Sequence, residues 1–315
     1  MNNLALWYRR FGEPASVLQP EITAPGALKP GELRVRMHYS PVNASDLIPI
    51  TGAYRHRTPL PAVAGYEGVG EVTEAPAVFA HLLGKRVLPL RGQGTWQQYV
   101  DCPAEYAIPV PDEVHSHLAA RAYINPLAAR MMLNLYLPQG KRVLLTAAGS
   151  DCAILLGQWA RSAGAEEVYG IHRSPVHGER LAAMGITPID QGNTAMVTAV
   201  AARADVVYDA TGGSLAETLL GVMPEEGVFV CYGLLSGQTF RQRRALPRVE
   251  WFHIRNYLDA LSVEAWQAAF RHIWPMLCAS QYSDVTVYPL TQWQAALQCY
   301  RQAGRVSKPL LDMNL

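Results

Sequence analysis

The segment that decides the fold is VLLTAAGSDCAILLGQWARSAGAEEVYGIHR, which runs from Val143 to Arg173. It begins with an apolar run that predicts a buried strand. The small residues Ala147-Ala148-Gly149-Ser150 follow, and then an apolar helical segment that ends at Gly164. A second apolar run at 168–171 predicts the next strand. This order of strand, tight turn, helix and strand is typical of a βαβ unit that holds a dinucleotide pyrophosphate at the helix N-terminus.

The turn lacks a complete G-x-G-x-x-G fingerprint, because Ala147, Gly149 and Cys152 stand roughly at the three glycine positions. A partial match is weak evidence, and a βαβ unit of an α/β protein that binds no nucleotide has the same order. The rest of the chain favours the nucleotide-binding interpretation. Strands and helices alternate as far as Gly233, which predicts a parallel, doubly wound sheet. Four residues fall at the carboxyl ends of its strands, where such sheets bind ligands: Gly149, Arg173, Thr211 and Gly233.

The pattern of elements divides the chain into two kinds of region. Residues 4–115 contain short strands punctuated by Pro and Gly, which indicate a small barrel or sandwich. The final apolar strand near Lys308 does not fit the parallel sheet. We therefore predict an α/β protein with a Rossmann domain at 118–261 and a discontinuous, mostly β domain built from 1–117 and 262–315.

The composition is that of a globular protein. Of the 315 residues, 50% are apolar and 17% are charged, so we expect a large core and little disorder. The formal net charge of +1 argues against nucleic acid or a membrane surface as the main partner. Five cysteines without a C-x-x-C pair argue against a disulfide framework and a zinc ribbon. The chain shows no signal peptide and no apolar run of the roughly 20 residues that span a bilayer, so a cytoplasmic location is expected.

Several segments resemble one protein family and occur in that family's order. They are LWYRRFGEPASVLQ at 6–19, PVNASDLIPITGAY at 41–54, LPAVAGYEGVGEV at 60–72, YINPLAARMML at 123–133 and AALQCYRQAGRVSKPLL at 295–311. These segments resemble the zinc-independent medium-chain dehydrogenase/reductase superfamily, and within it most closely the 2-enoyl thioester reductases. The resemblance covers nearly the whole chain. It implies a GroES-like catalytic domain together with the Rossmann domain, an enoyl reductase activity and a homodimer.

The chain departs from this family at the turn that would meet the cofactor pyrophosphate. Asp151-Cys152 replaces a Val-Gly pair there, and a carboxylate repels phosphates. Either Asp151 points away, favoured by the helix dipole, or cofactor binding is altered. Tyr66 replaces an asparagine at the position where zinc enzymes of the superfamily carry a metal-binding histidine. Ala44 and Ala128 replace a proline and a threonine.

The distribution of candidate ligands predicts no metal site. A catalytic zinc needs three converging Cys, His or carboxylate ligands. Asn43 stands in the region where the superfamily's zinc enzymes carry a cysteine, and their four-cysteine structural loop is missing. The nine histidines form no H-x-x-x-H pair on an expected helix.

Without a metal, hydride addition to an α,β-unsaturated carbonyl needs hydrogen-bond donors at the enolate oxygen and a proton source. Tyr54 matches the family's tyrosine for this role, and a phenol with a pKa of about 10 stays protonated at neutral pH. Packing in a loop is the structural alternative. Asn43 matches the family's asparagine near the nicotinamide, because its amide can donate and accept. Its alternative is a turn before Ser45-Asp46, where Asp46 is expected to cap or turn the chain.

The end of the second strand of the βαβ unit decides the expected cofactor. NAD-preferring units carry an acid there for the ribose hydroxyls. This chain has His172-Arg173-Ser174 instead, and these side chains can bind a 2′-phosphate, so NADPH is predicted. Arg180 is a weaker candidate. The expected cofactor-binding residues are Ala148, Gly149, Ser150, Asp151, Cys152, His172, Arg173, Ser174, Thr211, Gly212, Tyr232 and Gly233.

Asn125 and two basic clusters are the candidates for substrate binding. A helix is expected over Ala119–Leu135 with an interruption at Asn125-Pro126, where Asn125 either caps the helix or, by the resemblance, lies against cofactor or acyl chain. We expect Arg243 and Arg244 to meet the phosphates of a CoA or acyl-carrier-protein thioester, although such clusters are more often solvated faces. The clusters are Arg241, Arg243, Arg244 and Arg248, and Arg55, His56 and Arg57.

Together these features predict an NADPH-dependent reductase of the C=C bond of a 2-enoyl thioester, serving fatty acid or polyketide-type synthesis. A quinone or small enone reductase of the same superfamily is the alternative enzyme. A catalytically degenerate NADPH-binding sensor or accessory protein is the alternative of another class, and it is supported by Asp151 and the missing glycines.

Overall fold

The computed structural model describes residues 2–314 and divides the chain into two compact units. Unit 1 takes in Met1–Ile124, Leu261–Cys278 and Asp284–Leu315, and unit 2 takes in Asn125–Ala260 and Ala279–Ser283. The division differs from the expected domain boundaries at three places. The segment 118–124 and Leu261 group with unit 1, and the five residues 279–283 return to unit 2.

Unit 2 is built on one parallel sheet. Its elements are α4 (Ile124–Leu135), β9 (Arg142–Leu145), α5 (Asp151–Ser162), β10 (Glu167–His172), the 3-10 helix η3 (Pro175–His177), α6 (Gly178–Ala183), β11 (Thr187–Asp190), α7 (Thr194–Ala201), β12 (Val206–Asp209), α8 (Gly213–Val222), β13 (Val228–Cys231), β14 (Arg248–Trp251) and α9 (Arg255–Leu258). The sheet order is β11-β10-β9-β12-β13-β14 with every pair parallel. This is the order of a Rossmann sheet, whose ligand crevice lies at the carboxyl ends of the strands where β9 and β12 adjoin.

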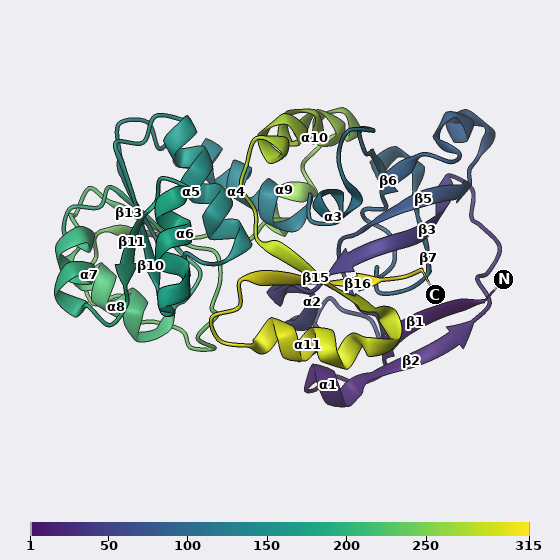
Figure 1. The fold of residues 1–315 in the computed structure, drawn as a ribbon, viewed down its shortest axis with the longest axis horizontal. Coiled ribbons are helices and arrows are strands. Elements are labelled where there is room, and N and C mark those ends of the chain that lie inside the picture. Colours follow the sequence, from purple (N-terminus) through teal and green to yellow (C-terminus); the bar gives the residue numbers. More distant parts are fainter. Residues whose placement is uncertain (1, 315) are drawn as a thin grey trace. The chain divides into compact units, whose positions relative to one another are not determined.

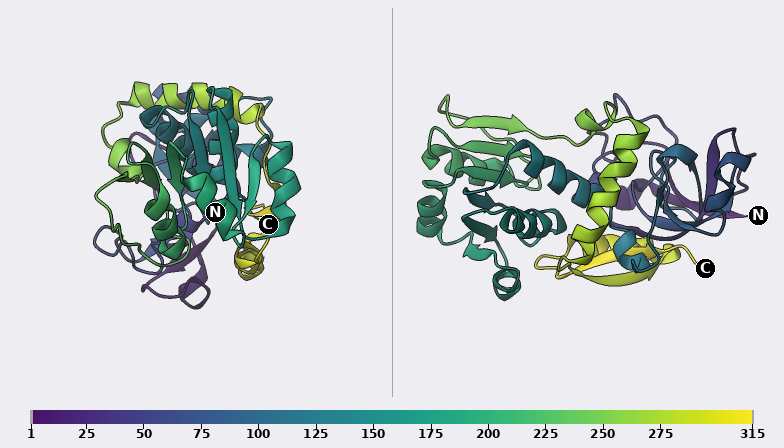
Figure 2. Two further views of the ribbon diagram at one scale, coloured as in Figure 1. Left: turned by 90° about the vertical axis from the view of Figure 1, so that its left-hand side faces the viewer. Right: turned by 90° about the horizontal axis from the view of Figure 1, so that it is seen from above.

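Helices cover both faces of this sheet, with α7 and α8 on one face and α5 and α6 on the other (Figures 1 and 2). The four inner strands β10, β9, β12 and β13 are short apolar runs that are buried along most of their length, as parallel strands with two covered faces require. Val197 of α7 and Leu219 of α8 pack in one cluster with Leu144, Val207 and Phe229 of the sheet. The predicted Rossmann architecture is therefore present.

Two details of unit 2 differ from the sequence prediction. The helix expected from Ala119 breaks earlier than predicted, because α3 (Ser116–Ala119) ends there and α4 begins at Ile124. Pro126 lies in the first turn of α4, where its missing N–H leaves no intrahelical bond unmade, so it does not interrupt the helix. The edge strands β11 and β14 were not predicted, because most of their residues are exposed or half-buried, unlike those of a buried parallel strand.

Unit 1 is mostly β. Its elements are β1 (Asn3–Tyr8), α1 (Pro14–Val17), β2 (Leu18–Thr23), β3 (Glu32–Pro41), α2 (Ala44–Leu47), β4 (Ala62–Val63), β5 (Val69–Glu74), β6 (Arg86–Leu88), β7 (Tyr99–Pro103), β8 (Ile108–Pro109), α3, α10 (Val263–Cys278), β15 (Asp284–Pro289), α11 (Trp293–Arg301) and β16 (Ser307–Asp312). A seven-stranded sheet has the order β15-β16-β3-β5-β6-β8 with β7 also on β3, and β2-β1-β4 forms a smaller sheet.

The C-terminal strand of the chain completes the larger sheet of unit 1. β16 pairs antiparallel with β3 and parallel with β15, so the last residues lie beside a strand near the N-terminus (Figure 1). The core beneath this sheet contains the fully buried Trp96 together with Leu33, Val35 and Leu311. The position of β16 places Lys308 in the interior of unit 1, where it is 4% exposed.

Candidate functional site

The turn between β9 and α5 has the geometry of an anion-binding helix start. Ser150 is the N-cap of α5, and its hydroxyl accepts a hydrogen bond from the Ala153 N–H at 3.4 Å. The Ala148 N–H donates to the carbonyl of Ile171 at 2.9 Å, which ties the turn to the end of β10. A Cβ atom built on Gly149 would lie 2.8 Å from the His177 ring, so a larger residue must displace that side chain.

The two residues that depart from the family lie in the first turn of α5. Asp151 is 7% exposed, and its carboxylate accepts a hydrogen bond of 2.6 Å from the Ser283 hydroxyl, which in turn accepts one of 2.8 Å from Arg180. The Asp151 carboxylate is therefore linked through the Ser283 hydroxyl to the Arg180 guanidinium. Cys152 is buried, and its thiol lies 3.9 Å from the carbonyl oxygen of Asn125 in α4.

The tip of β10 carries an exposed cation, Arg173. His172 is buried, whereas Arg173 is exposed and makes no hydrogen bond or ion pair with any residue in the range 2–314. Ser174 is half-buried and precedes η3, whose amide at His177 donates to its carbonyl oxygen. A guanidinium free of internal contacts can be used for a ligand phosphate.

The ends of β12 and β13 adjoin the same turn. Asp209 is fully buried and accepts hydrogen bonds from the Thr146 hydroxyl at 2.6 Å and from the amides of Thr211 at 3.0 Å and Gly212 at 2.9 Å. Burial raises the pKa of this carboxyl, which these three bonds oppose. The φ of Gly212 is 67°, a conformation that favours glycine, so Asp209 and Gly212 together fix the turn.

Tyr232 follows β13, and its amide donates to the carbonyl of Asp209 at 2.8 Å. Burial raises the pKa of the Tyr232 phenol well above its usual value, and the nearby Cys152 and Asp209 add to this shift. Gly233 comes next, and a Cβ atom there would lie 3.1 Å from the carbonyl oxygen of Ala210. The expected cofactor residues thus gather at the carboxyl ends of β9, β10, β12 and β13, four strands of one sheet.

Unit 1 contains a buried polar cluster around the start of α2. Asn43 caps this helix in a capping box, in which its amide N–H donates to Asp46 at 2.7 Å. The Asn43 side chain donates to Glu67 at 2.7 Å and accepts from the Lys308 ammonium group. The second Asp46 oxygen accepts from the amide of Tyr66 at 2.8 Å. We call Asn43, Asp46, Glu67 and Lys308 the α2 cluster, and each of them is at most 4% exposed.

The α2 cluster also holds the chain just before α4. Glu67 accepts hydrogen bonds from the amides of Tyr123 at 3.0 Å and Ile124 at 2.8 Å. Burial raises the pKa of Asp46 to about 7, and the neighbouring Glu67 carboxylate adds to the shift. Burial also raises the pKa of Glu67, against the effect of its amide donors and Lys308. Glu67 and Lys308 were missed from the sequence, although each is a charged residue within an apolar segment.

Tyr54 lies in the turn that follows α2. Its side chain is half-buried, and the guanidinium carbon of Arg57 lies 4.0 Å from the centre of its ring. Its carbonyl oxygen accepts hydrogen bonds from the amides of Arg57 and Thr58 at 3.0 Å, which fix the turn. Arg55, His56 and Arg57 are exposed.

The basic cluster after β13 does not form one uniform patch. Arg244 donates to the carbonyl of Met223 at 3.1 Å and pairs with Glu225 at 3.3 Å, so it closes the C-terminal end of α8. Arg248 opens β14 and pairs with Glu250 at 3.1 Å. Arg243 is exposed and has no hydrogen bond or ion pair with any described residue, whereas Arg244 is already bound within the protein.

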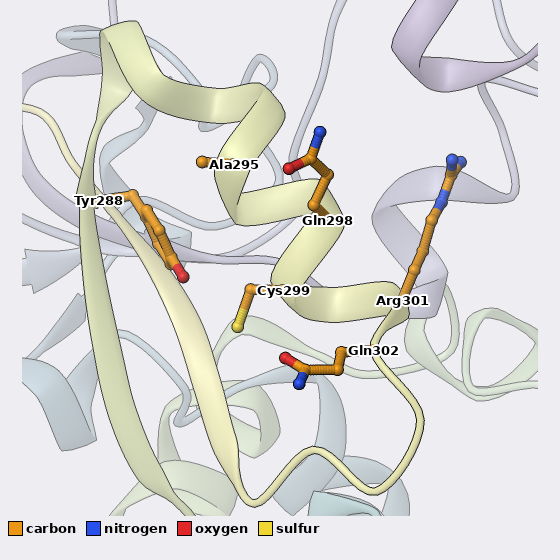
Figure 3. Close-up of a pocket in the computed structure, with 6 residues that line it drawn as sticks. All are labelled: Tyr288, Ala295, Gln298, Cys299, Arg301 and Gln302. Atoms are coloured by element: carbon orange, nitrogen blue, oxygen red, sulfur yellow. The ribbon is translucent and has the colours of Figure 1, made fainter.

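A surface hollow of about 600 Å³ lies between β15 and α11 in unit 1 (Figure 3). It is lined by Tyr288, Ala295, Gln298, Cys299, Arg301 and Gln302. None of the site residues expected from the sequence lines this hollow, so we assign it no part in the predicted reaction.

Residues 2–314 contain neither a cluster of metal-binding side chains nor a helix that could span a membrane. No group of three or more His, Cys, Asp or Glu side chains in this range is arranged to hold a metal ion. No helix in the same range combines the length and the apolar character needed to cross a bilayer. The cytoplasmic location stays a prediction from the sequence.

Comparison with known proteins supplies the family. The alcohol dehydrogenase GroES-like domain matches residues 29–112. A solved structure named "putative NADPH:quinone reductase" from Bacillus thuringiensis is 35% identical, covers 99% of both chains and superposes with a TM-score of 0.92.

Two curated relatives align over most of this chain. The mitochondrial enoyl-[acyl-carrier-protein] reductase of Arabidopsis thaliana is 31% identical over 245 residues, which are 74% of this chain and 65% of that protein. The human synaptic vesicle membrane protein VAT-1 homolog is 30% identical over 244 residues, which are 74% and 62%. The match thus spans less than two thirds of these two relatives. With the Rossmann sheet order, the GroES-like match and a solved relative alike over its whole length, the chain belongs to the medium-chain dehydrogenase/reductase superfamily of oxidoreductases.

Proposed function

We propose that this protein is an NADPH-dependent reductase of 2-enoyl thioesters. The observation that carries the cofactor assignment is Arg173 at the tip of β10, where an acid would select NAD. Its guanidinium is exposed and has no partner among residues 2–314. The name of the Bacillus thuringiensis relative agrees with NADPH. The name of the Arabidopsis relative and the segment YINPLAARMML favour a thioester substrate, on a carrier protein or CoA, in fatty acid or polyketide-type synthesis.

The residues of unit 2 fit this cofactor. The start of α5, with Ser150 as its N-cap and Gly149 before it, offers backbone N–H groups and the positive end of a helix dipole to a pyrophosphate. Arg173 and Ser174 would hold the 2′-phosphate. NADPH supplies the hydride that adds to the β-carbon of the substrate. The turn at Asp209 and Gly212 follows β12, at the same carboxyl end of the sheet.

Tyr54 is the proposed catalytic residue of unit 1. Its phenol donates a hydrogen bond to the thioester oxygen, on which negative charge develops, or delivers the proton to the α-carbon. No metal is required for this chemistry, and the groups of Asn43 and Asp46 are engaged in the α2 cluster. Asn125 and Arg243 remain the proposed contacts of the acyl chain and of the phosphates of the thioester carrier. Arg244 is no longer favoured for that contact, because it holds the end of α8.

The test is oxidation of NADPH in the presence of crotonyl-CoA, longer enoyl thioesters and a quinone. We expect turnover of the enoyl thioesters and a kcat about 100-fold lower in Tyr54→Phe. Tyr106→Phe removes a phenol from the same unit and should leave kcat unchanged. Full activity of Tyr54→Phe would remove Tyr54 from the mechanism.

A quinone reductase is the second candidate, supported by the name of the Bacillus thuringiensis relative. Turnover of the quinone with none of the enoyl thioesters would establish it. Quenching of tryptophan fluorescence by NADPH without turnover of either substrate class would instead favour the catalytically degenerate binding protein.

We also propose a homodimer formed through the edge of the parallel sheet. Within residues 2–314 no strand pairs with the outer edge of β14, and Trp251 on this strand is 56% exposed with its ring stacked on Phe240. An open edge with an exposed aromatic side chain is a surface for pairing with another copy. The molar mass from light scattering should be that of a dimer, and Trp251→Glu should shift it toward the monomer.

A further inference from the structure

At the start of α5, two hydrogen bonds join a guanidinium, a hydroxyl and a carboxylate, and the proposed function gives these bonds no role. Arg180 of α6 donates a hydrogen bond of 2.8 Å to the Ser283 hydroxyl, and that hydroxyl donates one of 2.6 Å to Asp151. Asp151 is 7% exposed and Ser283 is 5% exposed. A carboxylate and a guanidinium are thus linked through one hydroxyl at the end of the helix where a pyrophosphate would bind.

Ser283 is held in place by the segment to which it belongs. Residues 279–283 lie along α5, where the Gln158 amide donates to the Gln281 carbonyl at 2.9 Å and accepts from the Gln281 N–H at 2.8 Å. The Trp159 indole donates to the Ser280 hydroxyl at 2.9 Å. Because three hydrogen bonds fix this segment on α5, the Ser283 hydroxyl meets Asp151 in a defined position.

The position of Asp151 sets two effects against each other. A carboxylate in the first turn of a helix is stabilised by the helix dipole, so Asp151 stabilises the protein without cofactor. A pyrophosphate uses the same positive helix end, and the Asp151 charge opposes it. Through Ser283, the carboxylate also holds Arg180, a cation that could otherwise attract phosphates.

We propose that Asp151 lowers the affinity for the dinucleotide by weakening the binding of the pyrophosphate common to NADPH and NADH. The affinity that remains then depends on the 2′-phosphate and Arg173, which only NADPH engages. Asp151 therefore lowers the affinity for both cofactors, and the ratio between them is set by the contact of Arg173 with the 2′-phosphate. This inference rests on the proposed NADPH-dependent function.

The experiment measures the Kd of NADPH and of NADH by quenching of tryptophan fluorescence, together with the melting temperature, for wild type and Asp151→Asn. We expect both cofactors to bind about 3- to 10-fold tighter to the variant, by the same factor, while the free protein melts at a lower temperature. Glu264→Gln makes the same change of charge in the first turn of α10 and should leave both affinities unchanged. Asp151→Ser provides a second variant if the first does not fold.

Each outcome separates this inference from the proposed function. Unchanged or weaker binding of both cofactors in Asp151→Asn and Asp151→Ser, with a wild type that binds NADPH, overturns the role of Asp151 alone. A gain confined to NADPH also overturns it, because the pyrophosphate is common to both cofactors. Absence of binding in wild type and variants overturns both proposals, whereas binding that appears only in the variants supports the role of Asp151.

Discussion

Two regions that carry the family's polar residues differ in what those residues bind. In the α2 cluster of unit 1, Asn43, Asp46 and Glu67 are buried and direct their hydrogen bonds to one another, to Lys308 and to backbone amides. At the sheet edge of unit 2, Arg173 is exposed and has no partner among the described residues. Asn43 was selected because it lies in a family motif, and Arg173 because it follows the second strand of the βαβ unit. Among the described residues, the second region has the cation that makes no hydrogen bond or ion pair within the protein.

The difference shows which side chains can serve chemistry. Redirecting a buried side chain leaves its former partners without hydrogen bonds, at a cost of about 1–3 kcal/mol for each group. The Asn43 amide donates to Glu67 and accepts from Lys308, so these bonds favour a structural role for a residue that the resemblance placed near the nicotinamide. The catalytic proposal for unit 1 therefore depends on Tyr54.

Loss of the cation from the α2 cluster should have the largest effect on stability. Lys308→Met leaves two buried carboxyl groups without their ammonium partner, and we expect the free energy of unfolding to fall by about 3–5 kcal/mol. Chemical denaturation measures it, with the exposed Lys29→Met as control. The affinity of folded Lys308→Met for NADPH should be unchanged. If Lys308→Met instead weakened NADPH binding and kept the stability of the wild type, the α2 cluster would serve the cofactor and not the fold.

Loss of Arg173 should have the complementary effect on the cofactor. Arg173→Ala removes a charge-assisted contact to the 2′-phosphate, so the Kd of NADPH should rise about 10- to 100-fold. NADH lacks this phosphate, and its Kd should change little, which makes it the internal control. The melting temperature should stay that of the wild type because Arg173 has no partner in the described structure. An equal loss for both cofactors would place Arg173 elsewhere in the site.

The pH dependence of stability should reveal the proton held by the α2 cluster. Asp46 has a pKa of about 7 in the native state and about 3.9 when unfolded, so the native state binds a proton that the unfolded chain has lost between these values. Its contribution is therefore present at low pH and is lost as the pH rises toward 7, by at most about 1.4 kcal/mol per pH unit. Urea midpoints between pH 5 and 8 should show a smaller slope for Asp46→Asn than for wild type. Parallel slopes would assign the titration to another group.

Much of unit 2 could be predicted from the sequence, but little of the α2 cluster could. The four inner strands of the parallel sheet are local apolar runs, and the turns after β9 and β12 follow them directly, so periodicity was sufficient to predict them. Asn43 and Lys308 are separated by 265 positions, and no local pattern pairs them. The available signal was a lysine inside an apolar C-terminal strand, since a buried lysine requires a partner. Likewise, the partner of Asp151 comes from 279–283, which the prediction assigned to the other domain.

The smallest predicted effect concerns Gly149, in the turn between β9 and α5. Gly149→Ala places a Cβ atom 2.8 Å from the His177 ring, and this side chain must move to accommodate it. Because the turn forms the start of α5, we expect the Kd of NADPH to rise about five-fold, which corresponds to about 1 kcal/mol. Gly221→Ala in α8 is the matched control, since a Cβ atom there meets nothing within 4 Å and alanine is the better helix former. It should raise the melting temperature slightly and leave the cofactor Kd unchanged. If Gly149→Ala lowers stability as much as it lowers affinity, the turn supports the fold of unit 2 as well as the ligand. Gly149 would then combine the structural role of the α2 cluster with the ligand-binding role of Arg173.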